Sequence, residues 1–321
     1  MAKMLVTGGL GTVGAGLVRE LTQRGHTVVS CDLYHQPNEV GFTIGRDLRT
    51  AQYARADVGQ FRQIERIFDV LGPFDYVYHC AAEFGRWNGE DFHEVLWRTN
   101  AVGTKNLIRL QERLGFRLIH FSSSEVYGDW PDVMAEAVMD EHEVKQLNDY
   151  ALSKWVNEMQ IRNSTVQYGT QSVVVRLFNT YGPGEYYSPY RSVNCRFLFC
   201  ALSGLPWTVF RGHSRTSTYL ADTVRTLCNI VDSFKAGETY NIGGSTLHTI
   251  EELSDVVLKV TGANPALVHH AESEILTTKV KRVDISKSVR DLGHTNTIGL
   301  EEGMGLTADW MRETHDIRAG V

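Results

Sequence analysis

The chain has 321 residues, of which 42% are hydrophobic and 22% are charged, and its formal net charge at pH 7 is −6. A globular protein of this length buries a substantial core, as one large α/β unit or as two smaller ones. The acidic balance argues against a broad basic surface for nucleic acid, and no apolar run reaches the roughly 20 residues that a membrane span needs. We therefore expect neither a nucleic-acid nor a membrane partner.

Five cysteines are scattered along the chain, and their number is odd. Cys31 and Cys80 lie in strand-like apolar runs, which is typical of buried thiols. The pair Cys195 and Cys200 has no second pair of ligands at the spacing of a zinc site, so we predict no metal. The N-terminus lacks the layout of a signal peptide, and scattered thiols suit a reducing compartment, so we expect a cytoplasmic protein.

An apolar strand at residues 4–7 runs directly into a glycine-rich turn, and a helical pattern follows over residues 15–24. Glycines allow close approach of the backbone, and the N-terminus of a helix offers unpaired N–H groups to a pyrophosphate. This order of elements predicts a Rossmann dinucleotide site. The residues expected to contact the dinucleotide are Gly8, Gly11, Thr12, Val13 and Gly14.

The next predicted strand, residues 27–31, ends at Asp32. An acidic residue at this distance from the glycine turn meets the adenosine ribose. Its carboxylate accepts hydrogen bonds from both ribose hydroxyls and repels a 2′-phosphate. The sequence therefore favours NAD over NADP as the cofactor.

Strands and helices continue to alternate, with predicted helices over residues 61–70 and 92–114 and predicted strands over 76–80 and 117–121. This alternation indicates an α/β fold, a Rossmann-type doubly wound parallel sheet that binds ligands at the carboxyl ends of its strands. The residues expected there are Asp57 and Val58 near the adenine, and Ala81 and Ala82 along the cofactor.

The chain is expected to divide near residue 180. Residues 1–180 are predicted to form the NAD-binding domain and to carry the catalytic residues. Residues 181–321 are predicted to form mainly a smaller α/β region for the substrate, with some segments returning to the first domain.

Tyr150 and Lys154 are four residues apart, which places both side chains on one face of a helix. A nearby ammonium group favours the phenolate and lowers the pKa of a tyrosine from its ordinary value near about 10. Such a tyrosine could remove a proton from a sugar hydroxyl near neutral pH. Chance can supply a pair at this spacing, so its weight depends on the motifs that precede and follow it, among them the three serines, residues 122–124, that end the strand before it.

Together these motifs resemble those of extended short-chain dehydrogenase/reductases of the NAD-dependent epimerase/dehydratase family, from Met4 to about Trp310. The resemblance rests on the glycine turn and on residues 122–128, 150–154, 176–184 and 241–244. It implies a catalytic triad of Ser123, Tyr150 and Lys154, in which Lys154 also binds the nicotinamide ribose. Ser124 is expected to contact the substrate. The resemblance further implies a homodimer joined through the helices that begin near residues 92 and 150.

The same resemblance implies a nucleotide-sugar substrate held by the C-terminal half. Asn179 matches the residue that contacts the phosphates of the nucleotide sugar. Arg215 matches an arginine that grips the diphosphate, although Thr216 stands where relatives carry aspartate. Arg282 falls where relatives place another basic residue near the nucleotide, and simple surface charge is the alternative.

The C-terminal half is also expected to contain helices over residues 194–202, 222–230 and 300–311 and a strand over 207–210. Asp222 is the predicted N-cap of the second of these helices. The aromatic segment 185–191 suits either a loop over the substrate or an ordinary packed loop.

The chemistry common to the family is transient oxidation of the sugar, most often at C4, with hydride passing to NAD. We expect an epimerase, because returning the hydride to the other face needs the fewest extra groups. A 4,6-dehydratase, a decarboxylase or a dehydrogenase/reductase stays open, since Glu125 is either a further base or simply a hydrogen-bonded carboxylate at the end of a strand. The resemblance places an aspartate before this glutamate in dehydratases of dTDP-glucose, and Ser124 in that position argues against this type. A non-catalytic NAD-binding regulator is the other alternative, and the retained Tyr150 and Lys154 argue against it.

Overall fold

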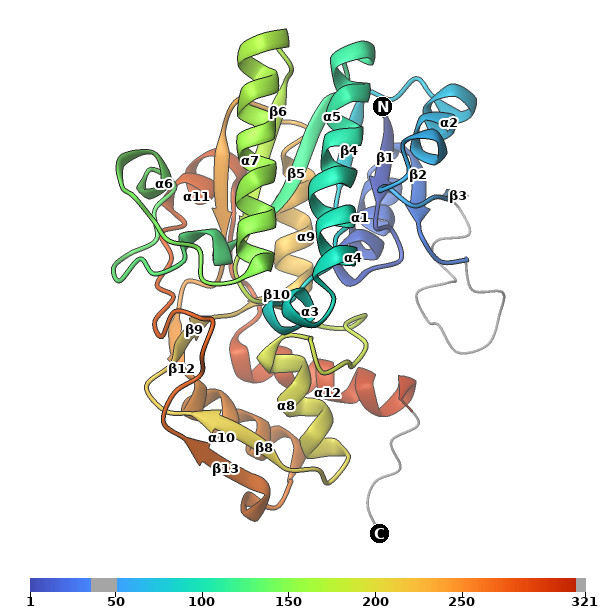
Figure 1. The fold of residues 1–321 in the computed structure, drawn as a ribbon. Helices are drawn as coiled ribbons and strands as arrows, with labels where there is room; N and C mark the ends of the chain where they lie inside the picture. Colours follow the sequence, from blue (N-terminus) through green and yellow to red (C-terminus); the bar gives the residue numbers. More distant parts are fainter. Residues whose placement is uncertain (36–50, 316–321) are drawn as a thin grey trace.

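A seven-stranded sheet forms the centre of the computed structural model, which describes residues 1–35 and 51–315 (Figure 1). Residues 36–50 and 316–321, which fall within the two predicted domains, lie outside the described residues. All strand pairs in the sheet are parallel, and the spatial order is β11-β6-β5-β4-β1-β2-β3. The strands are β1 (Lys3–Thr7), β2 (Thr27–Asp32), β3 (Gln52–Arg55), β4 (Tyr76–His79), β5 (Arg117–Ser123), β6 (Ser172–Leu177) and β11 (Thr239–Ile242).

Helices cover both faces of this sheet, which confirms the predicted doubly wound α/β fold (Figure 1). One apolar cluster joins the sheet to α1 (Thr12–Gln23), α9 (Leu220–Asn229) and α11 (Ser286–Leu292). A second joins the other face to α2 (Phe61–Leu71), α5 (Gly103–Leu114) and α7 (Asp149–Tyr168). The strands of a parallel sheet are buried on both faces, and the central strands β1, β4 and β5 are buried over nearly their whole length.

The helical stretch predicted over residues 92–114 is present, but it is not one regular α-helix. It consists of α4 (His93–Trp97), a π-helical segment (Arg98–Val102) and α5, and the short α3 (Arg86–Asp91) precedes it. The π-helical segment holds Asn100, whose amide donates to Glu83 O at 3.0 Å and accepts from Glu83 N at 2.8 Å. These two hydrogen bonds hold the chain that follows β4 against the helix, and π-helical turns are frequent at functional sites.

The C-terminal residues build a smaller layer below the carboxyl edge of the sheet (Figure 1). It contains α8 (Val193–Leu202), α10 (Ile250–Thr261), α12 (Leu300–Thr314) and the parallel pair β8 (Trp207–Phe210) and β13 (Val268–Ala271), around an apolar cluster of its own. Two short pairs link it to the main sheet region. They are β7 (Thr180–Tyr181) with β10 (Thr218–Tyr219), and β9 (Ser214–Thr216) with β12 (Leu247–Thr249).

The remaining short elements are the 3₁₀ turns Ser124–Tyr127 and Pro265–Leu267 and the helix α6 (Val138–Glu141). Within the described residues, no helix is both long enough and apolar enough to cross a membrane.

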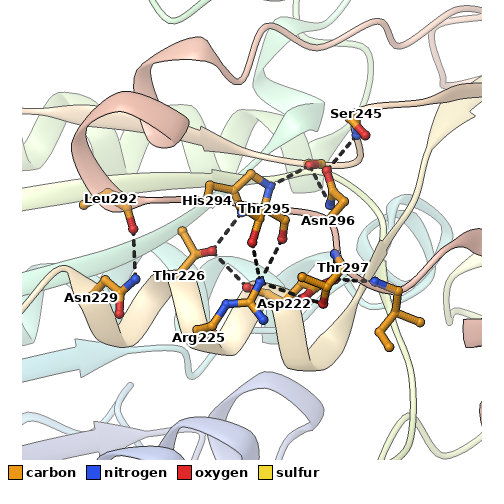
Figure 2. A network of polar contacts seen from close by, with 12 residues as sticks. Asp222, Arg225, Thr226, Asn229, Ser245, Leu292, His294, Thr295, Asn296 and Thr297 are labelled. Atoms are coloured by element: carbon orange, nitrogen blue, oxygen red, sulfur yellow. Dashed lines mark hydrogen bonds and ion pairs between the residues drawn. The ribbon is translucent and has the colours of Figure 1, made fainter.

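Asp222 does not have the predicted N-cap role, because α9 begins two residues earlier and Tyr219 stands at its N-cap. The Asp222 carboxylate instead accepts hydrogen bonds from the Thr297 and Ile298 N–H groups, at 2.8 and 3.1 Å, and pairs with Arg225 at 2.8 Å. Figure 2 shows these contacts within a network that fastens the chain before α12 onto α9. His294 extends it, since its ring contacts the Thr226 hydroxyl and the Gly243 carbonyl, each at 2.8 Å.

Candidate active site

A cavity of about 710 Å³ lies where the carboxyl ends of the sheet strands meet the C-terminal layer. Open parallel α/β sheets bind their ligands at the carboxyl ends of the strands. The cavity brings together all but one of the residues that the sequence predicted for the site. Those lining it are Gly8, Gly11, Thr12, Val13, Gly14, Asp32, Asp57, Val58, Ala81, Ala82, Ser123, Ser124, Glu125, Tyr150, Lys154, Asn179 and Arg215.

The glycine turn between β1 and α1 is packed too tightly for side chains. Gly8 has φ +70°, and a Cβ there would lie 2.7 Å from Ala81 N, while a Cβ on Gly14 would lie 2.1 Å from Gly8 O. No side chain caps α1, and its first turn contains no acidic residue. The N–H groups at the start of this twelve-residue helix are thus available to an anion, so the turn fits the pyrophosphate of a dinucleotide.

Asp32 is held at the end of β2 by backbone donors. Its carboxylate accepts hydrogen bonds from Leu10 N at 2.9 Å and Leu33 N at 2.8 Å, and Tyr34 N donates a longer one at 3.4 Å. A carboxylate has about four acceptor positions, so a lone pair remains for a ribose hydroxyl. The Asp57 carboxylate accepts one hydrogen bond, from Gly59 N at 2.8 Å, and lies 3.9 Å from Arg98.

The first two turns of α7 carry Tyr150 and Lys154, which line the cavity together with Ser123 at the end of β5. The helix begins there because the Asn148 side chain caps it, accepting from Ala151 N at 2.8 Å. Lys154 Nζ donates to Phe121 O at 2.8 Å and lies 5.9 Å from the centroid of the Tyr150 ring. The three residues predicted as a triad therefore lie together, at the end of β5 and near the start of α7.

The electrostatics of the tyrosine differ from the sequence-based expectation. Burial raises the pKa of Tyr150 to about 12; the hydrogen bond with Ser123 acts in the opposite direction, and the charge of Glu125 raises it further. Burial also lowers the pKa of Lys154 to about 8, against the charges of Cys80 and Glu158. Burial therefore opposes ionisation of the Tyr150 phenol, whereas the sequence predicted a lowered pKa beside Lys154.

A buried ion pair supports the helix one turn beyond Lys154. Arg176 on β6 donates to both carboxylate oxygens of Glu158, at 3.0 and 2.7 Å, and both side chains are almost completely buried. Ser122 also donates to Glu158 at 2.5 Å, and Arg176 donates to the Tyr127 hydroxyl at 2.9 Å. These contacts hold α7 against β5 and β6, and so fix the position of Lys154 relative to the sheet.

Glu125 faces a cation that the sequence did not single out. It forms an ion pair with the buried Lys281, while Arg282 is exposed and does not line the cavity. The structure thus brings Lys281, and not the predicted Arg282, to the site. Side chains alternate in an extended chain, so the pattern of residues 280–284 could have shown that only one of these neighbours points inward. Burial opposes ionisation of Glu125, but Lys281, Arg86 and Arg215 together hold its pKa below the ordinary value.

Arg215 on β9 lines the cavity, but part of its guanidinium is already engaged. It donates to Ser214 O and Lys279 O, both at 2.8 Å, and to the Thr277 hydroxyl at 3.1 Å. Burial lowers its pKa to about 10, with Glu125 acting in the opposite direction. Two of its five N–H donors remain for a substrate anion.

Other segments complete the lining of the cavity. Within residues 185–191, Glu185, Pro189, Tyr190 and Arg191 line it. Across residues 1–35 and 51–315, no group of three or more His, Cys, Asp or Glu residues is arranged to hold a metal ion.

Three comparisons with known proteins agree with this geometry. The family model described as "NAD dependent epimerase/dehydratase family" matches residues 4–243. The chain is 30% identical to a dTDP-glucose 4,6-dehydratase of Salmonella typhimurium, over 96% of this chain and 92% of the relative. It is 27% identical to a UDP-N-acetyl-alpha-D-glucosaminuronate decarboxylase of Bacillus cytotoxicus, over 97% and 98%. A crystal structure of UDP-glucose 4-epimerase from Thermotoga maritima superposes with a TM-score of 0.86 at 25% identity, over 98% and 99% of the two chains.

Proposed function

This chain belongs to the NAD-dependent epimerase/dehydratase family, and from that premise we propose that it is a nucleotide-sugar epimerase that first oxidises its substrate at C4 of the sugar. The relatives are enzymes that act on nucleotide sugars, and NAD is the cofactor of the family. The observation that carries the proposal is the joint placement of Ser123, Tyr150 and Lys154 in the cavity that also contains the glycine turn and Asp32.

The residues of the cavity fit NAD. The glycine turn and the free N-terminus of α1 would hold the pyrophosphate, and Asp32 would hold the adenosine ribose. Ala81 and Ala82 would lie along the cofactor because their side chains leave room for it. Bound NAD supplies the hydride acceptor and a positively charged nicotinamide ring.

Within this site Tyr150 acts as the general base toward the sugar hydroxyl, and Ser123 donates a hydrogen bond to the same oxygen. Because burial holds the Tyr150 phenol protonated, the proton transfer requires further positive charge beside it. Lys154 supplies part of that charge from its fixed place on Phe121 O. Asn179 and Arg215 are proposed to hold the diphosphate, with the nucleotide on the 181–321 side of the cavity.

A 4,6-dehydratase or a decarboxylase is the second candidate, and Glu125 is the observation that favours it. Its carboxylate lines the same cavity, is kept ionised by neighbouring cations and lies close enough to Tyr150 to influence the tyrosine's pKa. An ionised carboxylate beside the oxidised sugar carbon is a suitable base for removing the adjacent carbon-bound proton. Against a dehydratase of the dTDP-glucose type stands Ser124, which replaces the acid expected before Glu125.

A homodimer is also proposed, through α4, the π-helical segment and α7. Their outer surfaces carry exposed apolar side chains, a pattern that marks a protein–protein contact. These side chains are Val95, Val102, Leu152, Met159 and Val166. The helices lie on one face of the sheet (Figure 1).

The test is a panel of UDP-, dTDP-, GDP- and CDP-sugars incubated with the protein and NAD, with products identified by NMR. An epimer formed without net reduction of NAD supports the main proposal; a 4-keto-6-deoxy product or carbon dioxide supports the second candidate. Tyr150→Phe should abolish every such product, and unchanged turnover in that variant would refute the mechanism. Glu125→Gln should leave 4-epimerisation largely intact but abolish elimination or decarboxylation.

A further inference from the structure

Two ion pairs lie at the wall of the cavity near Tyr150, and the mechanism above uses neither of them as a pair. Arg86, at the start of α3, pairs with Glu274, and Lys281 pairs with Glu125. In each pair one residue comes from the sheet domain and the other from the C-terminal segment 272–283. All four side chains are at least four-fifths buried. Burying charges is costly, so a cluster of this size calls for a reason in binding or catalysis.

Glu274 uses only part of the hydrogen-bond donors of the Arg86 guanidinium. The pair is made through its terminal Nη2 atom, while Nε is buried and has no hydrogen-bond partner among the described residues. A guanidinium presents Nε and Nη as a fork that matches the two oxygens of a carboxylate. The Nε atom therefore keeps a donor that Glu274 does not use, and a carboxylate that took the place of Glu274 on the fork would satisfy it.

The cavity gives a ligand access to this cluster. Arg86 and Glu274 both line it, so a ligand can reach the pair. Arg215 is the residue proposed for the diphosphate, so Arg86 is the arginine of the cluster that remains for an anionic group on the sugar.

The cluster lies at the reacting end of the cavity. The helix α3 that begins with Arg86 packs on Tyr150, since a Cβ on Gly89 would lie 3.2 Å from Tyr150 N. Glu125 is close enough to Tyr150 to raise its pKa. A group bound by Arg86 would therefore belong to the sugar ring that Tyr150 oxidises, not to the distant nucleotide base.

We propose that Arg86 binds the carboxylate of a nucleotide-linked hexuronic acid, and that Glu274 occupies this position when no such substrate is present. The proposal rests on the nucleotide-sugar function given above and names the class of sugar. On binding, the sugar carboxylate replaces Glu274 on the guanidinium and also takes the unused Nε. Arg86 is thus a specificity-determining residue, and Glu274 is an internal competitor for it.

The experiment compares the binding of hexuronate and hexose carried by the same nucleotide, UDP-glucuronate with UDP-glucose first and then the matching dTDP, GDP and CDP pairs. Calorimetry with NAD present and in the Tyr150→Phe background measures affinity without turnover. The proposal expects the hexuronate to bind at least about tenfold more tightly, since a hydrogen-bonded charge contributes about that much. Arg86→Gln should reduce this preference at least about tenfold, and Arg86→Lys should restore only part of it. Glu274→Gln should tighten hexuronate binding.

Arg62→Gln is the matched control, because this arginine lies on α2 with its side chain 92% exposed, and it should leave the preference unchanged. Equal losses of hexuronate and hexose binding in Arg86→Gln would assign Arg86 to the diphosphate and overturn the proposal. A protein that prefers the hexose would overturn it too, while leaving the nucleotide-sugar function intact. If no member of any pair binds, the function proposed above fails, and this inference fails with it.

Discussion

The Arg176–Glu158 pair offers a direct test of how α7 is held in place. In Arg176→Met the guanidinium is replaced by an apolar side chain, and Glu158 is left as a buried carboxylate with Ser122 as its remaining side-chain donor. Removing one member of a buried pair costs about 3–5 kcal/mol of folding free energy because the other charge is stranded. Both side chains are at most 1% exposed, so the full penalty is expected.

Urea unfolding at pH 7, followed by circular dichroism and tryptophan fluorescence, measures this loss. The double variant Arg176→Met with Glu158→Gln should recover at least about 2 kcal/mol, because no buried charge then remains. Arg162→Met on the same helix is the control. Its ion pair with Asp140 is 39% and 56% exposed, so its loss should cost less than about 1 kcal/mol.

Two results would refute this reasoning. A loss below about 1 kcal/mol in Arg176→Met would mean that the stranded carboxylate is not costly. A double variant as unstable as the single one would instead assign the cost to the lost contacts of Arg176 with Tyr127 and Glu136. NAD affinity in the single variant reports the functional consequence, since Lys154 lies one turn before Glu158.

Further predictions concern the cofactor site and the buried lysine. Gly14→Ala should weaken NAD binding at least about tenfold in a fluorescence titration, because the new Cβ would lie 2.1 Å from Gly8 O. The control Gly305→Ala, with no atom within 4 Å of its new Cβ, should bind NAD normally and gain up to about 1 kcal/mol of folding free energy. Equal NAD binding by both variants would contradict the close packing of the turn. Asp32→Asn should lower the preference for NAD over NADP at least about tenfold, because the repulsion of the 2′-phosphate is lost, and an unchanged preference would remove Asp32 from the ribose site. Burial lowers the pKa of Lys154 to about 8 from its ordinary 10.5, so above pH 8 the unfolded chain binds more protons than the folded protein. The unfolding free energy of the wild type relative to Lys154→Met should therefore rise by about 1–3 kcal/mol from pH 8 to pH 10, and a flat difference would show that Lys154 is not desolvated.

Local sequence patterns were sufficient for the fold and for the parts of the site that lie on single elements. The alternation of strands and helices predicted the doubly wound sheet, since one apolar period identifies each element and parallel strands must be covered on both faces. The glycine turn, Asp32, Ser123, Tyr150 and Lys154 each sit at the end or start of such an element, so their convergence at the carboxyl edge followed from the fold class.

The misplaced expectations are explained by contacts with other parts of the chain. Asp222 resembles an N-cap, but contacts with residues 297–298 use its carboxylate instead. The helix over residues 92–114 has an uninterrupted helical pattern, and only the hydrogen bonds of Asn100 with Glu83 reveal the π-helical segment. In both cases a contact with a residue far away in the sequence changes the local structure that the neighbouring residues predict.

The amino-acid sequence by itself determined the sheet, the dinucleotide turn and the Tyr150–Lys154 spacing, because these depend on residues within one or two turns of each other. Only the tertiary structure decided that burial raises the Tyr150 pKa, that Lys281 and not Arg282 meets Glu125, and that Arg86 faces Glu274 with an unused Nε. Lys281 is 156 positions from Glu125 in the sequence, and Glu274 is 188 positions from Arg86, because Lys281 and Glu274 both lie on the C-terminal segment 272–283. Desolvation and long-range ion pairs depend on the path of the whole chain, and no local spacing records them.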